Sequence, residues 1–380
     1  MIIIIKVRAE KIPAHICTCA CTVTKIIQSY TAGQIQQKLH LTPDQIFPNQ
    51  PSIIFGPIPS PNLQCDPDIS PKHPDKDIWD LGLTPIKVGP LQKYLSQYPD
   101  QEAAQYLSNG FQNGFRLFYT GLRLPMQPRN MSSAKNQLSE LQSIIDKEIH
   151  LGRMAGPFDT PPISNLRCNP VGVLPKKDGS WRLITNLSGP IGNSVNDFID
   201  PSLCSVSYDS FDHAISMIQK LGKGALLCKM DLSSAFRLIP IHPSDFCLLG
   251  IRIDDKYYID KCMPFGCSIA CSTFEKFSSF LHWLVSNRAH SSNIIHYLDD
   301  FLFAGKADTP NCSQLSEIFQ STCEELGVPI NAKKTEGPTT MLSFLGLGID
   351  TIKQTIFIPA DKCVELGSKL TTLIYSKKSH

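Results

Sequence analysis

Apolar residues recur at helical spacing in the segment that follows residue 91. The pattern predicts a helix that begins at a serine cap, Ser132 or Ser133, and stops at Gly152. We therefore expect a helical extension over residues 91–155. The apolar face of that helix would consist of Leu138, Leu141, Ile145 and Ile149.

Hairpin patterns follow the extension. The text NPVGVLPKKDGSWRLITNL, residues 169–187, has two β-rich arms around KKDGS, and LLGIRIDDKYYIDKCM repeats this arrangement. Between them, YDSFDHAISMIQKLG predicts a capped amphipathic helix that ends at Gly222.

From residue 225 to 350 the predicted order is strand, helix, strand, strand, helix, strand, with the second hairpin inserted after the first strand. This is the split βαβ arrangement of a ferredoxin-like domain, and it predicts an α+β fold. The first strand, from Ala225, ends at Asp231. The predicted order places Asp231 next to the turn that contains Asp299.

Asp299 and Asp300 lie between two apolar runs in NIIHYLDDFLFAG. Together with Asp231 they would repel one another, and all three can ionise only if a cation neutralises them. A hard ion such as Mg²⁺ suits oxygen ligands, and no His or Cys accompanies the carboxylates. His296 would point to the opposite face of its strand, and we interpret it as structural. Two such ions would support an in-line phosphoryl displacement.

A second pair of adjacent aspartates is a useful comparison. Asp254 and Asp255 in IRIDDKYYID lie at the tip of a predicted hairpin. Solvated turn residues explain that pair fully. Adjacent aspartates alone therefore do not indicate a site, and the third carboxylate is what distinguishes Asp299 and Asp300.

Composition and net charge limit the partners and the cellular compartment that we expect. The formal net charge is +2, so a nucleic-acid partner would need local positive charge or a bound cation. The 14 cysteines are scattered through apolar segments, which favours reduced thiols in an intracellular protein, in either nucleus or cytoplasm. Their only cluster, CTCAC with Cys17, Cys19 and Cys21, is tighter than the usual structural zinc patterns, and its role stays open. No apolar run is long enough to suggest a membrane span.

Proline dominates the preceding segment. Residues 43–90 hold 11 of the 29 prolines, and proline fixes φ and removes a backbone donor. We expect an extended linker there, and poor order over residues 1–90 as a whole.

Six ordered motifs resemble those of reverse transcriptases. They are LPKKDGSWRL, KMDLSSAF, MPFG, YLDD, NAKKTEGP and FLGLGID, within residues 156–350. At a finer level, sequence segments that include LSGPIGNSVND and HYLDDFL resemble the polymerase of DIRS-like retrotransposons. The resemblance implies a right-hand polymerase fold, with fingers at about 156–224, a ferredoxin-like palm at about 225–350 and the start of a thumb or a tail at 351–380.

The resemblance also implies roles for the acidic cluster. Asp231 and Asp299 would be the main metal ligands, with Asp300 supporting and the Leu232 carbonyl completing one shell. Two Mg²⁺ ions are implied, and Mn²⁺ could replace them. Lys334 matches the lysine proposed to protonate pyrophosphate, although a solvated lysine is an open alternative with Lys333 beside it.

Further residues match nucleotide-binding positions of the family. Lys176 and Arg182 resemble the pair that clamps the incoming triphosphate. Phe236 would be the aromatic gate that excludes a 2′-hydroxyl, or a plain core aromatic. Phe265 and Gly266, in MPFG, would lie at the nucleotide, where glycine lets the backbone approach closely.

Three hypotheses remain on the sequence alone. The first is an RNA-directed DNA polymerase of a retrotransposon, which would take a primed RNA or DNA template and deoxynucleoside triphosphates. The second is a truncated, inactive remnant that binds nucleic acid or a partner, since no ribonuclease H text follows residue 350. The third is an unrelated phosphotransferase. Intact carboxylates favour the first over the second, and KKDGSWR with Phe236 favours it over the third. The oligomeric state stays open.

Overall fold

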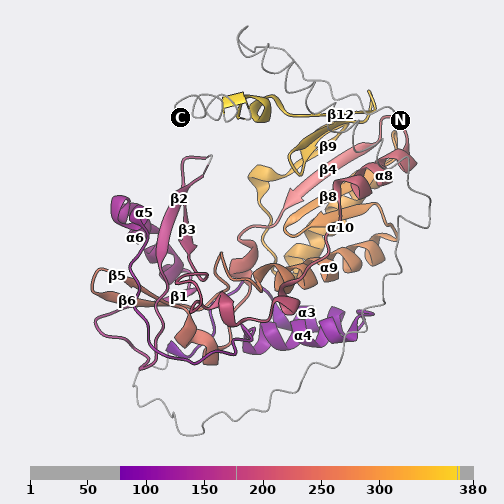
Figure 1. Cartoon of the computed structure of the whole chain (residues 1–380). Coiled ribbons are helices and arrows are strands. Elements are labelled where there is room, and N and C mark those ends of the chain that lie inside the picture. Colours follow the sequence, from indigo (N-terminus) through magenta and orange to yellow (C-terminus); the bar gives the residue numbers. More distant parts are fainter. Residues whose placement is uncertain (1–77, 177, 366, 369–380) are drawn as a thin grey trace, which may run out of the picture. The chain divides into compact units, whose positions relative to one another are not determined.

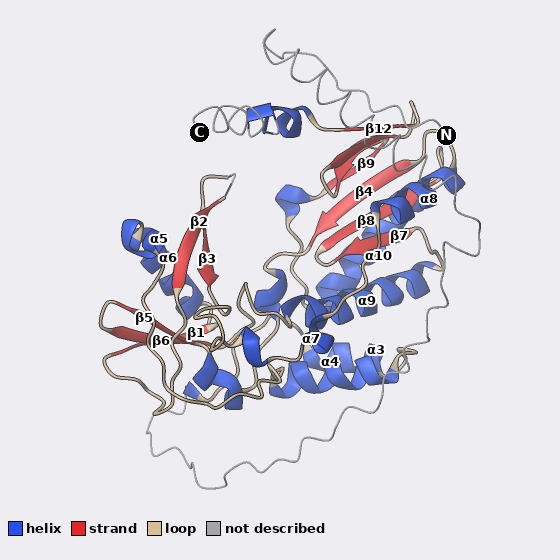
Figure 2. Cartoon of the chain, in the orientation of Figure 1, coloured by secondary structure: helices blue, strands red, loops and turns tan. Residues whose placement is uncertain are grey.

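A computed structural model of the chain describes residues 78–176, 178–365 and 367–368. Residues 75–342 form one compact unit, and Ser343 onward belongs to a second unit. The expectations for the cluster Cys17–Cys21 and for most of the proline-rich segment fall on residues outside these ranges. The structure mixes helices and strands, which confirms the α+β class (Figures 1 and 2).

A four-stranded antiparallel sheet lies at the centre of the first unit. Its strand order is β7-β8-β4-β9, and the chain connects β4, α9, β7, β8, α10 and β9 in sequence. This is the βαββαβ connectivity that the sequence pattern predicted. Helices α9 and α10 pack against each other and against these strands (Figure 2). The bounds are Leu226–Asp231 for β4, Ala270–Ala289 for α9, Ile294–Tyr297 for β7, Asp300–Gly305 for β8, Asn311–Leu326 for α10 and Glu336–Thr339 for β9.

Local chemistry sets the ends of these elements. Helix α10 ends at Gly327, which has φ +74°, and a Cβ there would overlap the backbone carbonyl of Pro85. Helix α8, Phe211–Leu221, begins with a capping box in which the Ser210 side chain accepts from the N–H of His213. Helix α8 ends at Gly222, the glycine that the sequence pattern predicted.

The inserted hairpin, β5 (Gly250–Ile253) and β6 (Lys256–Asp260), forms a separate sheet in the order β1-β6-β5 with β1 (Met154–Phe158). Its turn contains Asp254, with φ +51°, and Asp255. These aspartates are turn residues, as the sequence predicted.

A third β-structure is the hairpin of β2 (Val171–Pro175) and β3 (Trp181–Thr185), which the KKDGS text predicted. The helix expected beside it is broken in two at Gln137, where φ is −132° and ψ is 48°. The Ser133 hydroxyl does not cap a helix, because it accepts the backbone N–H of Val173 instead. The resulting helices are α5 (Ser132–Asn136) and α6 (Leu138–His150).

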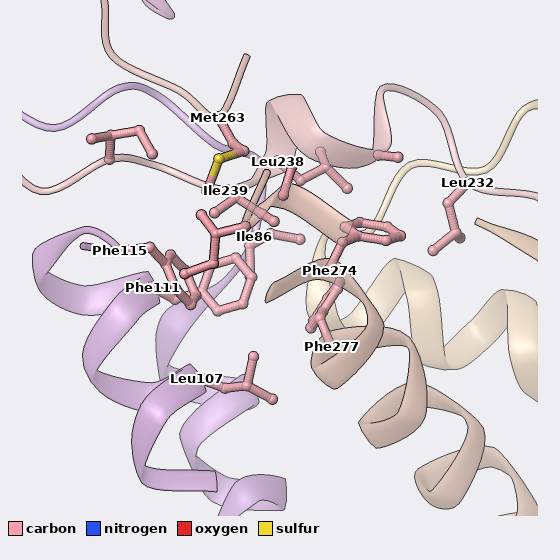
Figure 3. Close-up of a cluster of buried hydrophobic side chains, with 14 of the residues drawn as sticks. Ile86, Leu107, Phe111, Phe115, Leu232, Leu238, Ile239, Met263, Phe274 and Phe277 are labelled. Carbon is pink, nitrogen blue, oxygen red and sulfur yellow. The ribbon is translucent and has the colours of Figure 1, made fainter. Parts of the chain in front are cut away.

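The packed core begins ahead of residue 91. Ile78 and Ile86 are 2% and 5% exposed, so these two residues, which fall within the segment expected to be poorly ordered, belong to the core. Helices α3 (Val88–Leu95) and α4 (Gln101–Asn113) follow, and α4 packs on α9. Phe111 contacts Phe277 with ring centroids 5.1 Å apart (Figure 3). Burial of these aromatic rings joins the N-terminal helices to the palm-like sheet.

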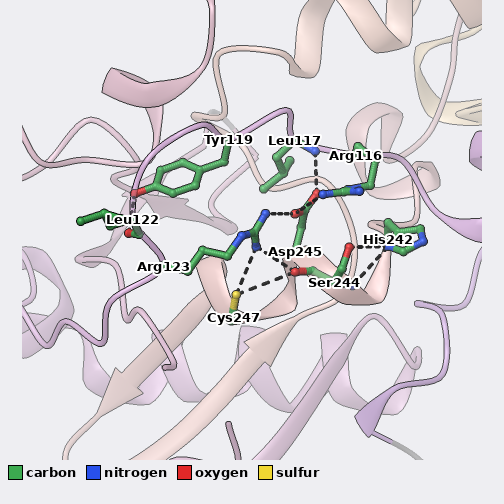
Figure 4. Close-up of polar contacts among 9 residues, drawn as sticks. All are labelled: Arg116, Leu117, Tyr119, Leu122, Arg123, His242, Ser244, Asp245 and Cys247. Atoms are coloured by element: carbon green, nitrogen blue, oxygen red, sulfur yellow. Dashed lines mark hydrogen bonds and ion pairs between the residues drawn. The ribbon is translucent and has the colours of Figure 1, made fainter. Parts of the chain in front are cut away.

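A buried carboxylate adds a polar tie to the same region. The Asp245 side chain is fully buried and accepts from Arg116, Arg123 and the N–H of Leu117 (Figure 4). Burial alone would raise the pKa of Asp245, but the two arginines and the N–H hold it below its ordinary value. This cluster fixes the chain after α4 onto the segment that precedes β5.

The remaining elements are short. Near the C-terminal end of the described residues, β10 is paired with β11 and β11 with β12. None of the helices in the described ranges combines the length and the apolarity that a bilayer span needs. The bounds are Asn196–Phe198 for η2, Pro201–Cys204 for α7, Ala235–Leu238 for η3, Pro243–Leu248 for η4, Ala332–Lys334 for η5, Met341–Phe344 for β10, Leu347–Asp350 for β11 and Thr355–Phe357 for β12.

Candidate active site

The ends of two central strands bring the three carboxylates together. Asp231 closes β4 and is the register partner of Asp300, which opens β8. The N–H of Leu232 donates to the carbonyl of Asp299 at 2.9 Å. Between β7 and β8 the turn consists of Leu298 and Asp299, and Leu298 has φ +52°. The predicted meeting of Asp231 with the YLDD turn is confirmed.

Burial and like charge act strongly on these side chains. Asp231 is 3% exposed. Burial, and then the charges of Asp231 and Asp300, raise the pKa of Asp299 to about 6. Burial and Asp231 raise the pKa of Asp300 as well. A divalent cation among these oxygens would remove the repulsion, so the donor set fits Mg²⁺, with the Leu232 carbonyl beside it.

One lysine contacts the cluster. Lys333 and Lys334 are both exposed, and Lys334 is the one that pairs with the cluster, with its Nζ 2.9 Å from Oδ2 of Asp231. Burial alone would lower the pKa of Lys334, but its hydrogen bond to Asp231 and the carboxylate charges raise it. The ammonium group of Lys334 is therefore charged beside Asp231. The ion pair with Asp231 distinguishes Lys334 from Lys333.

The sequence reasoning missed Asn331. Its Nδ2 donates to Oδ1 of Asp231 at 3.2 Å, and its N–H donates to the Asp231 carbonyl at 2.8 Å. Both bonds hold the Asp231 carboxylate in position. The signal was present in NAKKTEGP, where Asn331 lies three residues before Lys334.

Three aromatic rings and an arginine form a stack near the acidic cluster. The guanidinium carbon of Arg182, on β3, lies 5.1 Å from the ring centroid of Phe265. Phe265 contacts Phe236 at 5.3 Å, and Phe236 meets the buried Phe274 at 5.8 Å. Phe236 is half-buried, so it has both an exposed part and a core contact. The stack connects the β2–β3 hairpin to the sheet.

Lys176 and Gly266 have different surroundings. Lys176 is exposed at the β2–β3 turn. Gly266 has φ +104°, and a Cβ there would lie 2.6 Å from the carbonyl of Thr185. The absence of a side chain at Gly266 thus leaves room for the backbone of β3. Gly266 is exposed, and its contact with a nucleotide stays a prediction.

A second polar cluster lies on α9 and β7. His282 Nδ1 is 2.8 Å from His296 Nδ1, and His296 Nε2 is 2.8 Å from Glu275 Oε1. Burial, and then His296, lower the pKa of His282 to about 4. His296 contacts two residues of α9, His282 and Glu275, and its interpretation as a structural residue stays a prediction. No spacing in the sequence indicated that Asp209 and His282 would join it.

Residues 174–349 match the family model described as "Reverse transcriptase (RNA-dependent DNA polymerase)". The chain contains a reverse transcriptase domain. This domain includes β3, the whole βαββαβ sheet, Asp231 and the YLDD turn.

Curated relatives of the reverse transcriptase domain are retrotransposon polyproteins. The Transposon Tf2-3 and Tf2-7 polyproteins of Schizosaccharomyces pombe are each 23% identical over 180 residues, which is 47% of this chain. The matched region covers 12% of each relative's length.

Among solved structures, a foamy viral protease-reverse transcriptase dRH in complex with double-stranded DNA has a TM-score of 0.49 and 17% identity, covering 69% of this chain and 46% of that one. A foamy viral protease-reverse transcriptase in complex with an RNA/DNA hybrid has a TM-score of 0.48 and 17% identity, covering 74% and 37%.

Proposed function

We propose that this chain is a retrotransposon RNA-directed DNA polymerase that adds deoxynucleotides to a primer 3′ end. The observation that carries the proposal is the meeting of Asp231 with Asp299 and Asp300 at the ends of β4 and β8. Burial, and then the charges of Asp231 and Asp300, raise the pKa of Asp299 to about 6, so these carboxylates are poorly placed for stability alone. Such a cluster is typical of a site that binds cations and phosphates.

The roles of the acidic residues follow from this geometry. Asp231 and Asp299 would bind two divalent ions, Mg²⁺ or Mn²⁺, with Asp300 and the Leu232 carbonyl in support. When bound, the two ions would activate the primer 3′-oxygen and stabilise the leaving oxygen. Asn331 keeps the Asp231 carboxylate oriented. Lys334 would deliver a proton to the departing pyrophosphate.

The nucleotide side of the site would be formed by the aromatic stack. Arg182 and Lys176 would bind the triphosphate, with Arg182 held against the ring of Phe265. Phe236 would lie under the deoxyribose and exclude a 2′-hydroxyl, and Gly266 would leave room beside the base. The template and primer would be nucleic acid, in line with the double-stranded DNA and RNA/DNA hybrid named for the foamy viral proteins.

The decisive experiment is primer extension with the purified chain. We expect Mg²⁺-dependent addition of deoxynucleotides on a primed RNA template, and loss of it in Asp299→Asn. The matched control is Asp254→Asn, because Asp254 belongs to the other adjacent pair and its left-handed backbone, φ +51°, suits asparagine.

Failure of the unaltered chain to extend any primer, with its circular dichroism intact, would overturn the proposal. That result would favour the second hypothesis, a fold-retaining remnant that only binds nucleic acid. Membership of the DIRS-like group stays a prediction from the sequence text.

A further inference from the structure

The structure holds a cluster of potential metal ligands on the side of β7 that faces α9. His282 comes from α9, His296 from β7, and Asp209 from the residues just before α8. Each offers one ligand atom, and these three atoms all lie within 4.8 Å of one another. Among the described residues, this is the group of His, Cys, Asp and Glu side chains that meets that spacing.

The distances suit a single ion. His282 Nδ1 and His296 Nδ1 are 2.8 Å apart, and Asp209 Oδ2 is 3.9 Å from His296 Nδ1. Two ligands that bind one tetrahedral zinc ion at 2.0–2.2 Å lie roughly 3.3–3.6 Å apart. The imidazole rings are nearly perpendicular, with an interplanar angle of 83°. The two separations from His296 lie within about 0.5 Å of that range, and the third, between His282 and Asp209, is within 4.8 Å.

A second observation concerns the far side of His296. Its Nε2 lies 2.8 Å from Oε1 of Glu275, a buried carboxylate on α9. A proton on Nε2, donated to Glu275, leaves the lone pair of Nδ1 directed toward His282 and Asp209. Metal-binding histidines usually donate their other N–H to a carboxylate in this way, which fixes the tautomer and raises ligand basicity.

We propose that Asp209, His282 and His296 form a binding site for one transition-metal ion, with Zn²⁺ as the best match. Two imidazoles and one carboxylate are borderline ligands that suit Zn²⁺ better than Mg²⁺. The fourth position is left to water. The site is separate in chemistry from the oxygen-only cluster of Asp231, Asp299 and Asp300.

The bound ion would stabilise the turn of Leu298 and Asp299 through Glu275. Glu275 uses its second oxygen, Oε2, to accept the N–H of Leu298 at 3.3 Å. Leu298 is the residue with φ +52° that precedes Asp299. Binding at His296 would hold Glu275 in place, and Glu275 in turn holds the turn backbone. His296 and Glu275 are therefore positioning residues, which do not touch the reacting atoms.

The test measures the metal itself and does not depend on polymerase activity. The full chain is purified with Cys17, Cys19 and Cys21 replaced by serine, so that the thiol cluster cannot bind zinc, and its metal content is determined by mass spectrometry. We expect one zinc per chain. Replacement by Co²⁺ should give the visible d–d bands of a four-coordinate site without thiolate charge-transfer bands.

Substitutions of the proposed ligands test whether these residues bind the ion. In the chain that lacks the three cysteines, His282→Asn and Asp209→Asn should each lose most of the zinc. If the His282 variant does not fold, the Asp209 variant still tests the site. His150→Gln, at an exposed histidine, and Asp299→Asn should keep it. Zinc should also raise the melting temperature of the parent and of His150→Gln, and should not raise that of Asp209→Asn.

Three results would overturn the proposal. They are a parent chain without bound zinc or Co²⁺ bands, zinc retained in both ligand variants, and zinc lost in Asp299→Asn. The first would mean that His282 and His296 share only a hydrogen bond. Because none of these readouts uses primer extension, failure of the proposed polymerase function would leave the metal result standing.

Discussion

Asp231 and Asp300 face each other as register partners at the ends of β4 and β8, and Asp299 is tied to the same point through the N–H of Leu232. The sheet register therefore places three aspartates at adjacent strand ends before any ligand binds. That arrangement costs stability in the absence of cations. Its consequences can be measured.

Replacing Asp299 by asparagine should stabilise the metal-free chain at neutral pH. The folded-state pKa of Asp299, about 6, lies above its unfolded value, so stability falls as pH rises from about 4 to 6 and stays lower above that. We expect Asp299→Asn to gain about 1–3 kcal/mol at pH 7 and little at pH 4. Urea unfolding at both pH values, without divalent ions, checks this. Asp254→Asn serves as the control, and an equal gain at both pH values would contradict the explanation.

Removing the ring of Phe236 should weaken sugar discrimination. Phe236→Ala deletes the half-buried ring that rests on Phe265 and Phe274. We expect preference for deoxynucleotides over ribonucleotides to fall about 10- to 200-fold, measured as the ratio of kcat/KM values. Phe274→Leu loosens the same packing without removing the gate and should leave the ratio nearly unchanged. If both variants discriminate like the parent, Phe236 is a core aromatic only.

Lys334 and Lys333 should differ in their effect on catalysis. Lys334→Met removes the ammonium group that lies 2.9 Å from Asp231, and we expect kcat to fall about 10²- to 10⁴-fold with a small change in KM. Lys333→Met, at the exposed neighbour, is the matched control and should retain near-full kcat. Single-turnover extension at saturating nucleotide measures both. Equal losses in the two variants would mean that the motif contributes only general positive charge.

Replacing Asp245 should strongly reduce the free energy of unfolding. Asp245→Asn keeps the size of the side chain but leaves Arg116 and Arg123 without their buried counter-charge, and we expect a loss of about 3–5 kcal/mol in unfolding free energy. The pKa of Asp245 lies below its ordinary value, so the stability it provides is present at neutral pH and is lost as pH falls through that lowered pKa. Asp255→Asn, at an ion pair with a 94% exposed carboxylate, should cost less than about 1 kcal/mol. Denaturant unfolding of the two variants makes the comparison.

Much of the fold could be predicted because its signals are local. The glycine that ends α8, the turn sequences of the two hairpins and the strand-helix order from residue 225 to 350 all depend on short-range propensity and periodicity. The failure of Ser133 to cap a helix could not, because its hydroxyl accepts the N–H of Val173, a partner 40 residues away. The early start of the core was missed for the same reason. Ile78 and Ile86 show no periodicity and are ordered by distant packing.

The sequence by itself determined the family, the βαββαβ order and the three carboxylates, since strand order and motif spacing are properties of the linear chain. Only the tertiary structure decided which of two adjacent lysines contacts Asp231 and that Asn331 donates to it. It also decided that Asp209, His282, His296 and Glu275 meet next to the turn of Leu298 and Asp299. These relationships join side chains from different elements. Their distances depend on how helices pack on the sheet, and periodicity along the chain carries no information about that packing.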